Sequence, residues 1–392
     1  MTANLTNVAV LVLSNDVVPG FGVPVAAPGL RSSGIAAGLT SHGFDVELVV
    51  PGDVLRLAGG ANTTAPPGTT VVETPKLMQH IDASSADVVV FTNANLTPHL
   101  APRENLTYVY DLFAPKMLER LASPGPVPDW DQLAAQKERA LALADRVWVN
   151  GRRKMGYALG WMMRPGVETQ RRAMHKRSLF ELDPAQRLEL VEMPVLSLHD
   201  HEPREDTSQN TAAIRIGIGG YAQQWSVLPT EHLAHKTFAD AGYELHALLP
   251  QHWAAGDNQA PPSALPATTI MHRGPLQLLD FHRWVRSMDL MVDVFPQSSE
   301  RRLAMITRSA IALGWGVPVV HGVDSEVADI IREYDAGWVE TSLDPARWRA
   351  ISEEIADPAI RLRKRQGANA AQRERFEPHV ALAAAASSLK AL

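Results

Sequence analysis

The sequence predicts an α/β protein built from two domains, each a series of alternating strands and helices. The chain has 392 residues, which is more than one hydrophobic core usually holds, so two domains of ordinary size are expected. In both halves, short apolar segments of strand length alternate with longer amphipathic segments, the pattern of parallel sheets joined by helical crossovers. Residues 191–211 are polar and interrupted by proline. We place the domain boundary within them, between residues 193 and 194.

Composition narrows the class of protein. Hydrophobic residues make up 45% of the chain and charged residues 20%, proportions typical of a soluble globular protein. No apolar run approaches the length of a bilayer crossing, and the N-terminal residues do not resemble a secretion signal, so we expect a cytoplasmic protein. The absence of cysteine excludes disulfide and thiol chemistry. A net charge of −6 argues against general nucleic-acid binding.

Polar residues follow two of the strands predicted in the first half. These strands are expected at residues 8–13, 46–51, 87–92, 107–110 and 146–149, with a helix at residues 31–42. Ligands bind at the carboxyl ends of parallel strands, so Asp111 and Asn150 should face a ligand cleft. Asp111 has a second interpretation, as the N-cap of a helix that begins before Phe113.

Residues 298–322 contain the sequence pattern that most clearly suggests a binding site. They predict one helix with a serine cap, ended by Gly316 and followed by a short apolar strand. Arg301 and Arg308 are seven residues apart and would share one face of that helix, with Arg302 about 100° away around the axis. A helix N-terminus beside guanidinium groups is suited to binding an anion. The alternative is an ordinary helix and strand with a solvated basic face.

Several stretches resemble one enzyme family, the family 4 retaining glycosyltransferases, among them the loop from Gly219 and Gly220 to Gln224 and Trp225. TRSAIALGWGVPVV, at residues 307–320, is similar to the donor-binding helix and strand of that family. YVYDLFAPKMLE, at residues 108–119, and the glycine-rich loop GFGVPVAAPGLRSSG are similar to two further motifs. Members usually carry two glutamates eight positions apart, whereas Leu303 and Ile311 occupy those positions here. By the resemblance, Glu300 would take the sugar-facing role, and any ribose contact would come from elsewhere.

The resemblance spans nearly the whole chain and implies the GT-B fold, which is α/β with two Rossmann-like domains facing across a cleft. Residues 1–193 would form the acceptor domain and residues 194–371 the nucleotide-sugar donor domain, with a helix at 372–392 crossing back to the first domain. Asp111, orienting the acceptor hydroxyl, and Glu300 would be the catalytic residues. The expected donor contacts are Gly219, Gly220, Gln224, Trp225, Arg301, Arg302, Thr307 and Arg308. Gly29, Arg31 and Asn150 would line the cleft.

The activity implied by the resemblance is retaining, hexosyltransferase-type glycosyl transfer. A sugar would move from a nucleoside diphosphate sugar to a hydroxyl acceptor, which could be a glycan, a lipid-linked glycan or a small molecule. Arginines would neutralise the diphosphate leaving group, and a donor phosphate oxygen would take the acceptor proton. The donor is a substrate, and no cofactor is expected. Two alternatives stay open: a non-catalytic glycosyltransferase-like scaffold partner, and a nucleotide-sugar epimerase, which would need carboxylates or histidine to move a proton at carbon.

Two further patterns have simple interpretations beside functional ones. Asp129-Trp130-Asp131 resembles a metal-binding Asp-x-Asp motif, but it stands between a loop and a helical run. We therefore interpret it as a cap and a first-turn acid, and we expect a metal-independent protein without a metal site.

Residues 151–180 contain eight basic residues and one acidic residue. This asymmetry indicates either peripheral contact with the inner membrane face or a solvated helix.

Overall fold

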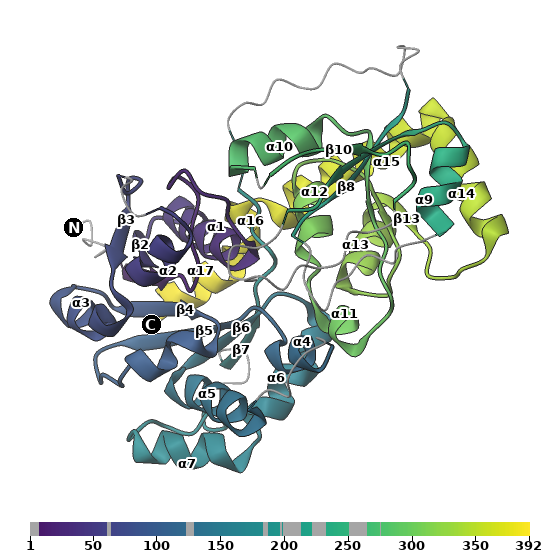
Figure 1. The fold of residues 1–392 in the computed structure, drawn as a ribbon. Helices are drawn as coiled ribbons and strands as arrows, with labels where there is room; N and C mark the ends of the chain where they lie inside the picture. The colour runs from purple at the N-terminus through teal and green to yellow at the C-terminus, as the bar shows by residue number, and fades with distance from the viewer. Residues whose placement is uncertain are drawn as a thin grey trace, which may run out of the picture. The chain divides into compact units, whose positions relative to one another are not determined.

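The structure is a computed structural model that describes residues 8–60, 64–122, 129–182, 187–196, 198, 213–221, 233–250, 265–274 and 276–392. It contains two parallel β-sheets with helices packed on them (Figure 1). Contacts divide the chain into two compact units: unit 1 is Met1–Arg120, Gly125–Pro194 and Pro378–Leu392, and unit 2 is Leu121–Pro124 and Val195–Glu377. The predicted α/β class with two parallel sheets is confirmed.

Unit 1 is built on a seven-stranded sheet in the order β3-β2-β1-β4-β5-β6-β7, with every pairing parallel. Its strands are Ala9–Leu13 (β1), Asp45–Pro51 (β2), Thr69–Val72 (β3), Val88–Thr92 (β4), Thr107–Leu112 (β5), Arg146–Val149 (β6) and Leu188–Leu190 (β7). The associated helices are Ala27–Ser41 (α1), Gly52–Leu57 (α2), Leu77–Ala83 (α3), Lys116–Ala122 (α4), Trp130–Leu143 (α5), Met155–Met162 (α6), Pro165–Ala173 (α7), Pro378–Ala381 (α16) and Ala383–Lys390 (α17). Three short 3-10 turns lie at Thr74–Lys76, Ala94–His99 and Arg152–Lys154.

The core of unit 1 has two layers, one on each face of its sheet. Alternate residues of β1 enter different clusters: Val10 and Val12 pack with side chains of α1 and α17, whereas Leu11 and Leu13 pack with side chains of α3, α5 and α6. Side chains alternate across a strand, so a strand that is buried on both faces must be apolar throughout. This requirement explains why the strands of the first half read as continuous apolar runs.

Unit 2 is built on a six-stranded parallel sheet in the order β10-β9-β8-β11-β12-β13. Its strands are Arg215–Gly219 (β8), Glu244–Leu248 (β9), Ile270–Met271 (β10), Leu290–Asp293 (β11), Val319–His321 (β12) and Gly337–Val339 (β13). Its helices are Leu233–Asp240 (α9), Leu278–Arg286 (α10), Ser299–Leu303 (α11), Thr307–Gly314 (α12), Glu326–Tyr334 (α13), Pro345–Ala356 (α14) and Pro358–Ala371 (α15), followed by a π-helical turn at Gln372–Phe376.

The single helix predicted within residues 298–322 is wrong, because the structure has two helices there. Ser298 caps α11 by accepting a hydrogen bond from the backbone N–H of Arg301. The chain then becomes extended at Ala304, and residues 304–306 are buried before α12 begins at Thr307. Three buried apolar residues continue the apolar spacing of a helix in the sequence, which explains the error. Arg301 and Arg308 therefore lie on different helices.

The end of the chain consists of short pieces rather than the one helix predicted from residue 372. The π-helical turn is followed by α16 and α17, whose residues belong to unit 1. Helix α16 lies close to α1, since a Cβ added to Gly38 would come within 2.5 Å of the carbonyl oxygen of Pro378. Leu382 and Leu389 are fully buried in unit 1. Among the described residues, none of the helices combines the length and apolarity that crossing a bilayer requires.

Candidate functional site

Two guanidinium groups of unit 2 lie over one phenyl ring. Strand β11 ends at Asp293, and the buried Phe295 follows two residues later. The guanidinium carbon of Arg308, in the first turn of α12, lies 4.3 Å from the centroid of that ring. The guanidinium carbon of Arg301, on α11, lies 4.6 Å from the same centroid. Cations are attracted to an aromatic face, so the Phe295 ring brings together two groups from different helices.

Each of the two guanidinium groups has a carboxylate nearby. The Nε atom of Arg308 lies 3.6 Å from an oxygen of Asp293, and the Nε atom of Arg301 lies 3.4 Å from an oxygen of Glu300. Arg301 is 5% exposed, yet its buried Nη2 atom has no hydrogen-bond partner among the described residues. Burial lowers the pKa of Arg308 to about 10 against the opposing effect of Asp293, which leaves the group charged at neutral pH. An unsatisfied buried donor costs free energy, so an anion with oxygen acceptors fits this site.

The loop after β8 brings backbone close to the same arginine. Gly220 has φ of +119°, which favours glycine, and a Cβ added there would lie 3.5 Å from side-chain atoms of Arg308. A Cβ added to Gly219 would lie 2.6 Å from the ring of Trp284, so packing requires glycine at this position. The structure thus places one of the two predicted donor-loop glycines beside Arg308. Contact between this loop and a phosphate stays a prediction.

The remaining predicted donor residues differ in their surroundings. Thr307 is the first residue of α12, whose N-cap Ile306 makes no side-chain hydrogen bond to the helix, and N–H groups at a helix N-terminus are suited to an anion. Glu300 is buried, whereas Arg302 is exposed on α11. Gln224 and Trp225 lie outside the described residues.

Unit 1 contains a second pairing of arginine with aspartate, which joins two residues predicted to belong to the site. Arg31 and Asp111 were expected to face a cleft, but both side chains are fully buried against each other. The Nη2 and Nε atoms of Arg31 donate to the two carboxylate oxygens of Asp111 over 2.8 and 3.1 Å, and Nη1 donates to the carbonyl oxygen of Glu192 over 2.5 Å. The cap interpretation of Asp111 is wrong, since the residue lies within β5. The pair fastens α1 to β5, and a role of Asp111 towards an acceptor stays a prediction.

The two other residues predicted to line the cleft are buried as well. A Cβ added to Gly29 would lie 1.8 Å from the carbonyl oxygen of Val17, so this glycine permits α1 to pack against the loop after β1. The side-chain oxygen of Asn150 accepts a hydrogen bond from Lys154, which also donates to the carbonyl oxygen of Phe113. The Nδ2 atom of Asn150 has no hydrogen-bond partner among the described residues, and the lining of a cleft by Gly29 and Asn150 stays a prediction.

Sequence reasoning missed Phe295 and the polar residues at the carboxyl ends of β11 and β12. These strands end at Asp293 and His321, which are register partners in the sheet. The rule that drew attention to Asp111 and Asn150, that polar residues at strand ends tend to face ligands, would have found Asp293 and His321 had it been applied to the second half. Phe295 gave no such signal, because a single aromatic residue after a strand is usually part of the core.

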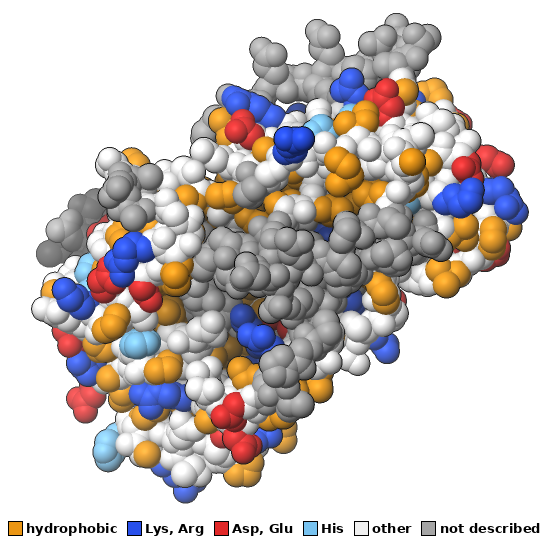
Figure 2. All heavy atoms as spheres, viewed as in Figure 1, with side chains coloured by type: hydrophobic (Ala, Val, Ile, Leu, Met, Phe, Trp, Pro, Cys, Tyr) orange, Lys and Arg blue, Asp and Glu red, His pale blue; other side chains and the backbone are white. Residues whose placement is uncertain are grey.

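The basic segment at residues 151–180 is largely occupied by contacts within unit 1. Lys154 and Arg171 are buried, and Arg171 donates to the carbonyl oxygens of Ala142 and Ala144. Three further basic residues form ion pairs, which are Arg164 with Glu138, Arg172 with Glu168, and Lys176 with Asp145. Figure 2 shows basic and acidic side chains interspersed over the visible face rather than gathered by sign. Membrane contact through this segment stays a prediction.

The described residues contain no group of three or more histidine, aspartate or glutamate side chains arranged to hold an ion, and metal independence stays a prediction. The Asp129 side chain accepts a hydrogen bond from the backbone N–H of Gln132, and Asp131 lies in the first turn of α5. The interpretation of these two residues as a cap and a first-turn acid is therefore confirmed.

The comparisons with known proteins find solved structures that are similar to this chain, but no similar sequence. No protein-family model matches the sequence, and no curated protein matches it. Sucrose-phosphate synthase from Thermosynechococcus elongatus is similar with a TM-score of 0.63 and 10% identity, over 98% of this chain and 97% of that chain. HepE from Anabaena, in complex with UDP and glucose, gives a TM-score of 0.60 and 12% identity, over 98% and 100%. WaaG, a glycosyltransferase involved in lipopolysaccharide biosynthesis, gives 0.56 and 12%, over 97% and 98%. Together with the two parallel sheets, these similarities show that the chain has the GT-B fold, with two Rossmann-like units.

Proposed function

We propose that this chain is a glycosyltransferase whose unit 2 binds a nucleoside diphosphate sugar. The observation that carries the proposal is the pair of guanidinium groups on the Phe295 ring, with a buried Nη2 atom of Arg301 that no described residue accepts. A diphosphate provides negative charge and several oxygen acceptors in a small volume, which is what such a pair can bind. HepE, which shares the fold, has been crystallised with UDP and with UDP-glucose. That finding supports a nucleotide-sugar donor here.

In the proposed reaction, the bond between the anomeric carbon and the diphosphate oxygen breaks, and a bond from the acceptor oxygen to that carbon forms. The bonding electrons leave with the diphosphate, whose charge Arg301 and Arg308 stabilise. The acceptor proton passes to a phosphate oxygen of the donor, on the face that the leaving group vacates, so the anomeric configuration is retained. Glu300, which is buried beside Arg301, would contact the sugar. The proposed transferase is of the hexosyl type and needs no metal ion and no cofactor.

We propose the acceptor domain at residues 1–193 and the donor domain at residues 194–371, with residues 372–392 returning to the first. The acceptor would be a hydroxyl of a glycan, a lipid-linked glycan or a small molecule, and the protein would work in the cytoplasm. Nuclear magnetic resonance of the product tests the stereochemistry directly, since an inverted anomeric signal would contradict the retaining reaction while leaving the transferase proposal intact.

The test of donor binding is calorimetric titration of the full chain with UDP-glucose and with other nucleoside diphosphate sugars. Losing a charge-assisted phosphate contact costs about 1.5–3 kcal/mol, so Arg308→Ala should weaken binding of the preferred donor roughly ten- to a hundredfold. The matched control is Arg349→Ala, which removes the same charge from an exposed position on α14 and should leave affinity unchanged. Equal affinity of Arg308→Ala and the wild type would show that Arg308 does not contact the donor. If no nucleotide sugar binds the wild type, the chain is a scaffold.

A further inference from the structure

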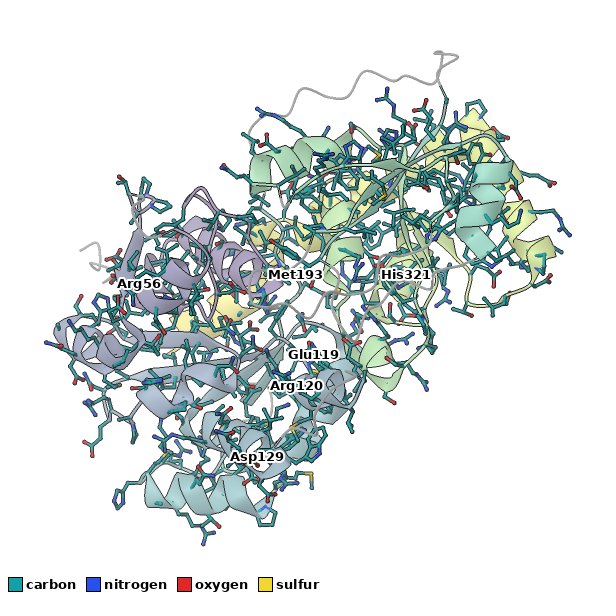
Figure 3. All side chains as sticks on the ribbon, viewed as in Figure 1. Arg56, Glu119, Arg120, Asp129, Met193 and His321 are labelled. Atoms are coloured by element: carbon teal, nitrogen blue, oxygen red, sulfur yellow. The ribbon has the colours of Figure 1, made fainter. Side chains whose placement is uncertain are left out.

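A continuous hydrogen-bonded chain of buried side chains links four elements of unit 2. The Oγ atom of Ser309, on α12, donates to an oxygen of Asp293 at the end of β11 over 2.5 Å. The same Oγ atom lies 3.1 Å from Nδ1 of His321 at the end of β12. The Nε2 atom of His321 lies 2.8 Å from Oγ of Ser325, which caps α13 by accepting from the backbone N–H of Ala328. Figure 3 labels His321 within the ribbon of unit 2.

The proton positions in this chain follow from the number of donors. A carboxylate only accepts, so the single hydroxyl proton of Ser309 points to Asp293. The Nδ1 atom of His321 must then be the donor to Ser309. Burial lowers the pKa of His321 to about 4, so the ring is neutral at pH 7 and its Nε2 atom is an acceptor for the hydroxyl of Ser325. Ser325, His321 and Ser309 thus each donate in the same direction, from the N-terminus of α13 towards Asp293, which accepts.

The last member of the chain also pairs with the arginine of the proposed donor site. Asp293 accepts from Ser309 through one oxygen and lies 3.6 Å from Nε of Arg308 through the other. Ser309 and Arg308 are neighbours in the first turn of α12. A side chain with many rotatable bonds loses conformational entropy when it is held in one orientation, and a fixed carboxylate beside its Nε atom reduces that cost at the moment a ligand binds. The chain therefore fixes both the helix that carries Arg308 and the carboxylate that orients it.

We infer that Asp293, Ser309, His321 and Ser325 are positioning residues that hold Arg308 in the orientation that receives a donor phosphate. This inference rests on the proposed function. All four are buried, and none of them is among the proposed donor contacts. The donor directions derived above satisfy each link from Ser325 to Asp293. The other oxygen of Asp293, which faces Nε of Arg308 over 3.6 Å, has no hydrogen-bond partner among the described residues.

Two substitutions of His321 separate positioning from packing. In His321→Asn the side-chain amide nitrogen takes the place of Nδ1 and can still donate to Ser309, whereas in His321→Gln the amide reaches the place of Nε2 and the Ser309 link is lost. Both remove the ring, so both should lower the melting temperature to a similar extent. A net hydrogen bond contributes about 0.5–1.5 kcal/mol, so His321→Gln should raise the dissociation constant of the donor about three- to tenfold. His321→Asn should restore affinity to near the wild-type value. Ser309→Ala removes one oxygen and breaks the same link, and should behave like His321→Gln.

The coupling to Arg308 is measured with a double-mutant cycle. In an Arg308→Ala background, His321→Gln should change the dissociation constant no further, although it should still lower the melting temperature. Additive effects on affinity, or equal affinity losses in His321→Asn and His321→Gln, would overturn the inference.

A second measurement needs no ligand. The Nε–H resonance of Arg308, assigned by its loss in Arg308→Ala, should be sharp in the wild type and in His321→Asn and broadened in His321→Gln and Ser309→Ala. If no nucleotide sugar binds but the resonance behaves in this way, the proposed function fails and the positioning chain stands. If donors bind and the resonance is the same in all variants, the positioning chain fails and the proposed function stands.

Discussion

Each unit places an arginine beside an aspartate at the carboxyl edge of its sheet. The two pairs differ in how deeply they are buried and in whether they form direct hydrogen bonds. In unit 1, Arg31 and Asp111 are fully buried and joined by two direct hydrogen bonds. In unit 2, Arg308 lies 3.6 Å from Asp293, and its side chain keeps 16% of its surface exposed above Phe295. The hydrogen bonds of Arg31 to Asp111 are made within the protein, whereas Arg308 is only partly exposed and makes no direct hydrogen bond to Asp293 at 3.6 Å. The same two residue types therefore support structure in one unit and the proposed donor site in the other.

The largest expected effect comes from breaking the pair of Arg31 and Asp111. Asp111→Asn keeps the side-chain shape but leaves the charge of Arg31 buried without its partner, which costs about 3–5 kcal/mol. Chemical denaturation of the full chain should show this loss, while transfer per folded molecule stays at the wild-type level. Asp131→Asn, at an exposed position on α5, is the control for the change of residue type. If Asp111→Asn is as stable as the wild type but transfers poorly, Asp111 orients the acceptor as the sequence predicted, and the comparison between the two pairs is wrong.

The next largest expected effect is a change of the free energy of unfolding with pH. Each unit contains a buried group with a shifted pKa, and the two shifts have opposite directions. Burial lowers the pKa of His321 from 6.5 to about 4, although Asp293 opposes the shift. The unfolded chain therefore takes up this proton first as the pH falls. The contribution of neutral His321 to stability is fully present above pH 6.5 and is lost as the pH falls towards 4, by up to about 3 kcal/mol.

Asp16 in unit 1 has the opposite sign. Burial raises its pKa from 3.8 to about 6, so its contribution is present below pH 3.8 and is lost as the pH rises through 6. Denaturation at pH 4.5, 5.5 and 7 checks both groups. The stability advantage of the wild type over His321→Asn should shrink on going from pH 7 to pH 4.5, and that over Asp16→Asn should grow. Parallel pH profiles for the wild type and His321→Asn would show that the histidine is not buried in its neutral form.

The two pairs also show which features of the fold and the site could be predicted from the sequence. The α/β class and most strands followed from apolar runs, because a strand buried on both faces leaves a direct record in the sequence. The Arg31–Asp111 pair joins residues 80 positions apart, and no local pattern records which aspartate an arginine will meet. The break between α11 and α12 was hidden because residues 304–306 are apolar and buried, which is equally compatible with a helix. Arg301 and Arg308 were identified for a helical spacing that does not exist, and Phe295 is what brings them together.

The smallest expected effect is that of removing metal ions on turnover, and it depends on the positive charges of Arg301 and Arg308. A metal ion in a glycosyltransferase neutralises the diphosphate that leaves, and Arg301 and Arg308 can supply that charge instead. Turnover should therefore survive EDTA. Asp129 and Asp131 look like a metal-binding motif, but Asp129 caps α5 through Gln132, and Figure 3 labels it in unit 1, whereas both arginines belong to unit 2. Substituting both with Asn keeps a good cap and removes two charges near a helix N-terminus, which costs about 0.5–1 kcal/mol of stability and little activity. Loss of turnover in EDTA that magnesium or manganese restores, and that the double variant reproduces, would mean that the two arginines do not carry the leaving-group charge alone.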